Sequence, residues 1–180
     1  MKALLGAAKQ GTHELLEKIL NFTTDLEATD RFEKTALIWA AEKGRIECLQ
    51  LLIKAKANLE AKDKSGKTAL IWAVENHHVA CAQLLVDKKA NIDVVNNGNI
   101  TALMIAASIG LSSHVHQLVE AKANLDAVDK LGKTALTWAV ELGNTECAQL
   151  LLDAKADVEI KDNDGKTALM RATEHGHIAC

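Results

Sequence analysis

The chain has 180 residues, of which 48% are hydrophobic and 25% are charged, so we expect one folded domain and exclude a disordered chain. Its formal net charge of −3 argues against a nucleic-acid binder, and no apolar run approaches the ~18 residues of a membrane span. Four widely spaced cysteines favour reduced thiols and an intracellular location, cytoplasmic or nuclear.

One period organises the chain from its first predicted helix onward. The triplet Thr-Ala-Leu recurs every 33 residues, and Lys2-Ala3-Leu4 lies one period before the first copy. The threonines of the triplet are Thr35, Thr68, Thr101, Thr134 and Thr167. Such self-similarity is typical of repeat proteins, in which each repeat buries its apolar face against its neighbours.

Each period predicts the same series of local structures. An Asp or Asn opens a turn, a glycine often follows three residues later, and the threonine is an N-cap candidate for a short helix. In the first full copy this helix runs from Thr35 to Gly44, a residue that suits a helix C-terminus. A second helix is predicted over residues 46–55, with the apolar set Ile46, Cys48, Leu49, Leu52 and Ile53.

These motifs resemble the ankyrin repeat family over essentially the whole chain. The resemblance is carried by Asp-x-x-Gly-x-Thr-x-Leu-x-x-Ala, by Gly176-His177 and by Leu-Leu-x-x-x-Ala. It implies an all-α solenoid of stacked helix-turn-helix pairs with projecting β-hairpin-like loops, and a role in binding proteins. We expect a single ankyrin-repeat domain over residues 1–180, with repeats at about 1–29, 30–62, 63–95, 96–128 and 129–161 and a partial repeat at 162–180.

The sequence departs from the family pattern at three positions of the repeat. Alanine replaces the proline after the cap threonine, and other residues replace the histidine two positions further on. Lysine replaces the glycine that usually closes the second helix, at Lys56, Lys89, Lys122 and Lys155. Each lysine costs about 1 kcal/mol if its backbone stays left-handed. We expect the fold to survive, because stacking between repeats stabilises such arrays.

No pattern predicts catalysis, a metal site or a cofactor. The Gly-Lys-Thr triplets, such as Gly66-Lys67-Thr68, lack the earlier glycine of a phosphate-binding loop and fit a turn followed by a helix cap. One column of the repeat contains Cys48, Cys81, Cys147 and Cys180, with His114 in the remaining copy. Stacked helices lie about 8–10 Å apart, too far for a shared disulfide or zinc ion, so these residues are predicted to be buried fillers.

A row of large side chains on the first helices is the first part of the predicted binding site. Trp39 lies two residues beyond Leu37, about 200° around the helix, and is therefore predicted to point off the core. The same row contains Trp39, Trp72, Ile105, Trp138 and Arg171, and its acidic companions are Glu42, Glu75 and Glu141. The alternative is that the indoles lie flat and cover neighbouring repeats without touching any partner.

The hairpin tips form the second part of the predicted site, and most of them are basic. The tip residues are Arg31, Phe32, Lys34, Lys64, Lys67, Lys130, Lys133 and Lys166. The family resemblance implies that the tips and the inner, concave row of first helices make most partner contacts. Tryptophan and arginine are enriched among binding hot spots, and lysine can add a cation–π contact to an indole. We expect a partner protein with acidic residues near an apolar anchor.

The sequence thus predicts a non-catalytic protein–protein interaction module, a monomeric scaffold or adaptor without cofactor. Because the chain stops at Cys180, where a second helix would begin, we expect it to be a piece of a longer array or larger protein. The alternative function follows from this: a targeting or regulatory portion of a multidomain protein or enzyme whose catalytic domain lies outside the chain. An engineered consensus array is disfavoured by irregular positions such as Glu33, His77 and Asn99.

Overall fold

The fold was analysed in a computed structural model that describes residues 2–22 and 25–177. The described residues form eleven α-helices and no β-strand, as the all-α prediction requires. Contacts between residues divide the chain into two compact units, residues 1–96 (unit 1) and 97–180 (unit 2). None of the described helices combines the length and the apolar character that a membrane crossing requires. The repeat boundaries and the single domain stay predictions.

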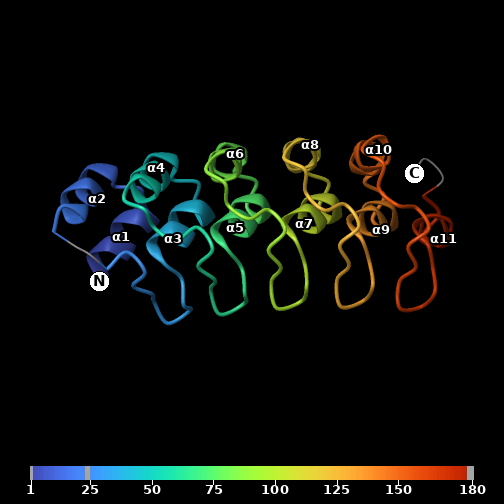
Figure 1. Cartoon of the computed structure of the whole chain (residues 1–180), viewed down its shortest axis with the longest axis horizontal. Coiled ribbons are helices and arrows are strands. Elements are labelled where there is room, and N and C mark those ends of the chain that lie inside the picture. The colour runs from blue at the N-terminus through green and yellow to red at the C-terminus, as the bar shows by residue number, and fades with distance from the viewer. Residues whose placement is uncertain (1, 23–24, 178–180) are drawn as a thin grey trace. The chain divides into compact units, whose positions relative to one another are not determined.

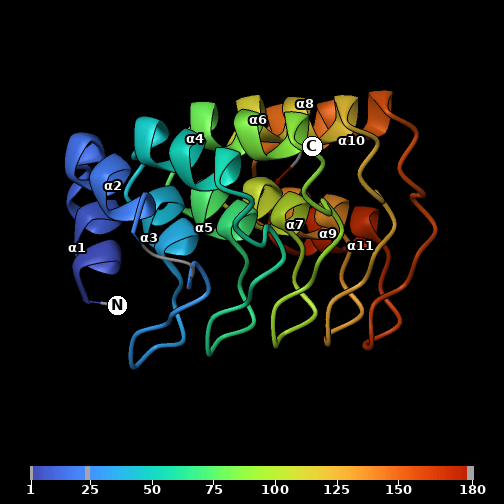
Figure 2. The same cartoon turned by 60° about the vertical axis from the view of Figure 1, so that its left-hand side comes forward.

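Unit 1 contains three helix pairs, in which a first helix packs on the second helix that follows it (Figure 1). The helices are α1 (Lys2–Gln10), α2 (His13–Leu20), α3 (Ala36–Glu42), α4 (Ile46–Lys54), α5 (Ala69–Glu75) and α6 (Val79–Asp87). The first helices α1, α3 and α5 contact one another in series, and so do the second helices α2, α4 and α6. Unit 1 is therefore a two-layer stack, and long loops project from the layer of first helices (Figure 2).

Unit 2 repeats this plan with two complete helix pairs and one further first helix. Its helices are α7 (Ala102–Ser108), α8 (Ser112–Glu120), α9 (Ala135–Glu141), α10 (Thr145–Asp153) and α11 (Ala168–Glu174). Helix α9 packs on both α7 and α11, and α8 packs on α10. The hairpins before α9 and α11 project from the first-helix layer, as they do in unit 1 (Figure 1).

Each hairpin ends at a threonine that caps the following helix, as the repeat predicts. The Thr35 hydroxyl accepts a hydrogen bond from the backbone N–H of Ile38, at 3.3 Å, and Thr134 accepts one from Thr137 at 3.2 Å. The same bond recurs at Thr68, Thr101 and Thr167. The cap satisfies one of the N–H groups that the first turn of a helix leaves without an intrahelical partner, and so sets where α3, α5, α7, α9 and α11 begin.

The core lies between the two helix layers of each unit and consists of small and aliphatic side chains. Leu37, Ala40 and Ala41 of α3 are buried, and so are Leu49 and Leu52 of α4. The column of fillers is confirmed for its described members, which are Cys48, Cys81, Cys147 and His114. Cys180 lies outside the described residues. The small alanines of the first helices let the two layers approach closely.

The lysines that replace the glycine after each second helix keep the left-handed backbone. Their φ angles are 67° at Lys56, Lys89 and Lys122 and 71° at Lys155. Three other irregular positions of the repeat, Glu33, His77 and Asn99, are also left-handed, with φ between 60° and 63°. The fold therefore imposes one conformation on these sites whatever the residue, and a residue with a Cβ atom is strained there.

Substituting Lys122→Gly should remove this strain and raise the free energy of unfolding by about 1 kcal/mol. The matched control is Glu120→Gly at the last residue of α8, where the backbone is helical and glycine should instead destabilise by about 0.5–1 kcal/mol. Urea unfolding followed by circular dichroism measures both. Equal effects of the two glycines would show that the left-handed conformation at Lys122 carries no cost.

Candidate partner-binding surface

In four of the repeats, an aspartate at the start of the hairpin organises the loop that follows. One carboxylate oxygen of Asp63, Oδ1, accepts hydrogen bonds from the backbone N–H groups of Ser65 and Lys67, at 2.9 and 3.0 Å. The backbone N–H of Asp63 in turn donates to the carbonyl of Lys67, at 3.0 Å. Equivalent carboxylate bonds form at Asp30, Asp129 and Asp162. The hairpin tips are therefore fixed by a side chain as well as by the backbone.

The second oxygen of the same carboxylate binds the tryptophan of the helix that follows. The indole Nε1–H donates to Oδ2 of the aspartate nine residues earlier, at 3.0 Å for Trp39 with Asp30 and 2.8 Å for Trp72 with Asp63. In unit 2, Trp138 donates to Asp129 at 3.0 Å. Each aspartate thus ties the hairpin to the first helix, which holds the tip at a defined position beside that helix.

In the three repeats that contain a tryptophan, a lysine from the end of the hairpin covers the indole and pairs with a glutamate on the helix. Lys67 Nζ lies 4.3 Å from the centroid of the Trp72 ring and 2.6 Å from an oxygen of Glu75. In unit 2, the three corresponding residues are Lys133, Trp138 and Glu141, with distances of 4.5 and 2.6 Å. Lys34, Trp39 and Glu42 make the same contacts. We call each set, together with its aspartate, an Asp–Trp–Lys–Glu cluster.

In unit 1, two of these clusters join into one alternating series of lysines and tryptophans. Lys34 Nζ lies between two indoles, 4.7 Å from the centroid of Trp39 and 3.7 Å from that of Trp72. Lys9 of α1 lies 4.1 Å from the other end of the series at Trp39, and Lys67 closes it at Trp72. Each ammonium sits within the ~6 Å range of a cation–π contact. The series therefore links α1, α3 and α5 through their side chains.

Burial and charge pairing shift the pKa values of the cluster carboxylates. Burial raises the pKa of Glu42, but hydrogen bonds and charge attraction from Lys34 and Lys43 outweigh this effect and lower it below the usual range. Burial opposes ionisation of Asp63 as well, and its bonds from Ser65, Lys67 and Trp72 lower its pKa. Both carboxylates are thus held as anions, which keeps the hydrogen bonds of the cluster charge-assisted.

The indoles are more enclosed than the helical angle between Leu37 and Trp39 predicts. Trp39 is only 8% exposed, and Trp72 and Trp138 are half-buried. The angle describes directions within one helix and takes no account of the hairpin. The hairpin aspartate binds the edge of the indole, and the hairpin lysine covers the face of the ring. Their packing role is therefore evident in the structure, and their contact with a partner stays a prediction.

Two members of the predicted row belong to clusters of different composition. Ile105 is half-buried, and its repeat also replaces the other cluster residues, with Asn96, Ile100 and Ser108. Arg171 takes the tryptophan position in α11 and donates from Nε to Asp162 Oδ2 at 2.7 Å, while also pairing with Asp164. Bonds to Asp164 and Asp162 raise the Arg171 pKa further above its usual range. Lys166 pairs with Glu174, as the other hairpin lysines pair with their glutamates.

The predicted tip residues separate into an enclosed group and an exposed group. Lys34 and Lys133 are buried within their clusters, and Lys67 is half-buried. The exposed members of the predicted set are Arg31, Phe32, Lys64 and Lys130, and Leu131, which follows Lys130 at the tip, is exposed as well. Phe32 is 46% exposed with the Arg31 guanidinium 4.6 Å from its ring centroid, and Leu131 is 53% exposed. The tips thus present apolar side chains beside basic ones.

Other reactive groups of the described residues have structural surroundings. Burial raises the pKa of the Cys81 thiol to about 11, so the thiol is protonated and unreactive at neutral pH. His78 opens α6, and its Nε2 lies 3.1 Å from the carbonyl oxygen of Glu42 in the neighbouring repeat. Within residues 2–22 and 25–177, no group of three metal-ligating side chains is placed to hold an ion.

Comparison with known proteins places this geometry in a family. A model of ankyrin repeats in three copies matches residues 4–97 and 103–180. An ankyrin repeat domain from Acinetobacter baumannii is 30% identical, with a TM-score of 0.92 over 98% of this chain and 92% of the other. The ankyrin repeat protein EF0377 is 28% identical, with a TM-score of 0.92 over 98% and 93% of the two chains. No curated protein matches the chain.

A third similar structure contains a complex of two proteins. It is the predatory endopeptidase Bd0816 of Bdellovibrio bacteriovorus in complex with the immunity protein Bd3460. The matched chain is 31% identical, with a TM-score of 0.86 over 98% of this chain and 93% of the other. Paired helices, capped by threonine and joined by projecting hairpins, define a helical repeat protein. The family match is specific: the chain belongs to the ankyrin repeat family.

The buried ion pair between Lys34 and Glu42 predicts that the variant Glu42→Gln loses stability in a pH-dependent manner. Removing the charge leaves Lys34 enclosed, with each side chain of the pair only 10% exposed, so unfolding at pH 7 should become easier by about 3 kcal/mol. The difference from wild type should shrink as the pH falls below 4.5 towards the lowered pKa of Glu42, because protonation then removes the same charge from the wild type.

The matched control is Glu174→Gln, which removes the glutamate of the more exposed pair with Lys166. Solvent screens that pair, so its loss should change stability far less. Urea unfolding at a series of pH values separates the two variants. Equal destabilisation by both, or a Glu42→Gln effect that does not change with pH, would contradict a stabilising role for the buried pair.

Proposed function

We propose that the protein is a non-catalytic scaffold or adaptor that binds a partner protein through its hairpin tips and the adjoining row of first helices. Ankyrin repeat domains typically act as protein-binding modules, which supports the general class. The similar chain in the endopeptidase–immunity protein structure belongs to a protein complex, which fits the same class. The observation that carries the proposal is the pairing of rigidly held tips with exposed apolar and basic side chains.

The clusters and the tips have different tasks in this proposal. Lys34 and Lys133 are enclosed and their charge is compensated by glutamate, so they contribute little attraction to a partner. The side chains of Arg31, Phe32 and Leu131 extend from the same hairpins and are exposed. The clusters hold the tips in place before binding, and a preorganised loop loses less conformational entropy when a partner docks.

The partner is an acidic protein segment with an apolar anchor. Phe32 in unit 1 and Leu131 in unit 2 supply apolar contact area, and each has a basic neighbour, Arg31 or Lys130. Basic groups at the rim of an interface speed the encounter with an acidic partner, while the apolar group supplies much of the affinity. Half-exposed Trp72 and Trp138, with the glutamates Glu75 and Glu141, border these tips on the first helices.

A double substitution at one tip, Arg31→Glu with Phe32→Ser, tests this proposal. Both side chains are exposed, so the free energy of unfolding should change little, whereas partner affinity should fall by about 2 kcal/mol or more if the tip is a hot spot. Proteins captured by wild type and lost by the variant are identified by mass spectrometry, and their affinity is then measured with purified components at several salt concentrations.

The matched control is Phe22→Ser, which removes another phenylalanine, 92% exposed but outside the hairpin tips. Its captured proteins should be those of wild type. Trp72→Ala serves as a second comparison, because loss of a packed indole should lower stability as well as binding. Unchanged affinity of a purified partner for the Arg31/Phe32 variant would rule out this tip as a binding site.

A further inference from the structure

A second feature of unit 1 lies on the side of the second helices, away from the hairpins. Helices α4 and α6 pack side by side, and a hollow of about 520 Å³ opens between them. Its lining consists of Gln50, Ile53, Lys54, Leu84 and Lys88. Ile53 and Leu84 are both half-buried and form an apolar floor, with Lys54 and Lys88 beside it. We call this feature the α4/α6 groove.

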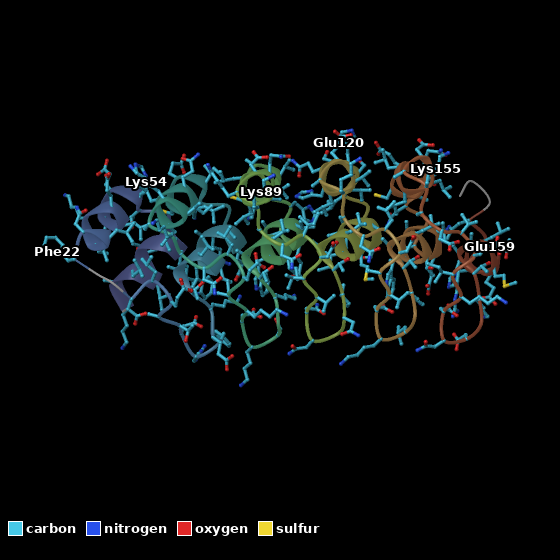
Figure 3. The ribbon with its side chains drawn as sticks, in the orientation of Figure 1. Phe22, Lys54, Lys89, Glu120, Lys155 and Glu159 are labelled. Carbon is cyan, nitrogen blue, oxygen red and sulfur yellow. The ribbon has the colours of Figure 1, made fainter. Side chains whose placement is uncertain are left out.

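The groove lies in a concentration of uncompensated positive charge. Lys54 ends α4 and Lys88 caps the end of α6, and each is followed closely by a left-handed lysine, Lys56 or Lys89. Figure 3 shows Lys54 and Lys89 on the second-helix side of unit 1. Among the described residues, none of these four lysines forms an ion pair. The cluster lysines of unit 1, Lys34 and Lys67, differ in this respect, because Glu42 and Glu75 neutralise them.

Nearby negative groups do not cancel this charge. Asp87 ends α6 and accepts a hydrogen bond from Gln83 at 2.8 Å. Each helix C-terminus adds only about half a negative charge from its backbone carbonyls. Against these stand four full positive charges on exposed side chains, so the rim of the groove has a net positive potential.

The same helix pair in unit 2 forms without the counterparts of Lys54 and Lys88. At the positions of Lys54 and Lys88, two repeats later, stand Glu120 and Ala154. Helices α8 and α10 still pack against each other, and α8 still ends at Glu120. Packing of second helices therefore does not require Lys54 or Lys88, and their role has to be sought at the surface.

We propose that the α4/α6 groove is a docking site for an acidic protein segment that carries a large aliphatic side chain. The aliphatic side chain enters the hollow between Ile53 and Leu84, and carboxylates on either side of it pair with Lys54 and Lys88. The site is separate from the hairpin-tip surface and does not depend on the proposed function of that surface. Its charge complementarity excludes basic segments, because like charges would then face each other.

A protein segment suits this site better than an anionic membrane does. A bilayer presents a flat array of headgroups and binds the lysines that protrude furthest, without filling a concave apolar floor. The groove combines both elements, a hollow for one side chain and a rim for charge, which is the usual arrangement of a small anchor site in a protein interface.

Fluorescence anisotropy with a labelled synthetic peptide tests the site on the complete chain. The probe is a short peptide of glutamate and aspartate with one central leucine, and two control peptides replace the leucine by serine or the acidic residues by lysine. The first peptide should bind in a salt-dependent manner, and both controls should bind at least about tenfold more weakly. Equal binding of the leucine and serine peptides would overturn the role of the hollow.

Two variants test the lining of the groove. Each introduces the residue that stands at the equivalent position of another repeat, where the same helix pair forms. Lys54→Glu with Lys88→Ala copies unit 2 and should weaken the acidic leucine peptide at least about tenfold. Leu84→Gln copies Gln117, one repeat later, and should weaken the leucine peptide but not the serine peptide. Circular dichroism and urea unfolding confirm that each variant is folded.

Lys122→Glu in unit 2 and the Arg31→Glu/Phe32→Ser tip variant are the matched controls, and both should bind the peptide as wild type does. Unchanged peptide affinity in the Lys54/Lys88 variant would overturn the proposal, as would loss of binding in the tip variant alone. Cosedimentation with phosphatidylserine–phosphatidylcholine vesicles is run in parallel. Vesicle binding that depends on Lys54 and Lys88, with no peptide binding, would replace the protein partner by a membrane.

Discussion

The aspartate carboxylate that starts four of the hairpins is the constraint on which the surface of this protein depends. In Asp63, one oxygen accepts two backbone N–H groups of the loop and the other accepts the indole N–H of Trp72, so one side chain defines both the turn and its attachment to the helix. An ionised acceptor makes these bonds stronger than neutral ones, and the lowered pKa keeps the group ionised. A long projecting loop, which would otherwise lose much entropy on binding, is thereby ordered in the free protein.

The lysine and glutamate of a cluster complete the contacts of the tryptophan that the aspartate holds. An indole held by its edge leaves one ring face open, and the hairpin lysine covers this face while its charge is compensated by the glutamate, as in Lys67, Trp72 and Glu75. The residues of a cluster therefore support one another. The repeat that begins at Asn96 agrees with this dependence, because it lacks the aspartate, the lysine, the tryptophan and the glutamate together.

Sequence reasoning predicts the parts of this structure that depend on local chemistry. The threonine caps, the paired helices and the buried cysteine column follow from spacing and residue type. Burial of Trp39 does not, because the angle around a helix describes only the helix, and a hairpin from earlier in the chain closes over the ring. The spacing nevertheless held a signal: each tryptophan lies nine residues after an aspartate, and each cluster lysine eight residues before a glutamate. Rules for side-chain pairs within a helix consider residues that are three or four positions apart. They do not identify pairs that are eight or nine positions apart.

The structure also shows that lysine has two distinct uses in one repeat. At the hairpin, Lys67 is neutralised and packed, and its charge contributes to the fold. At the end of the second helix, Lys56 has a strained backbone and an exposed side chain, and its charge faces solvent. A count of basic residues therefore overstates the attraction that the hairpins offer to an acidic partner and misses the charge on the opposite layer. What a repeat protein can bind depends on which charges its own frame has already compensated, and only the contacts of each residue reveal this.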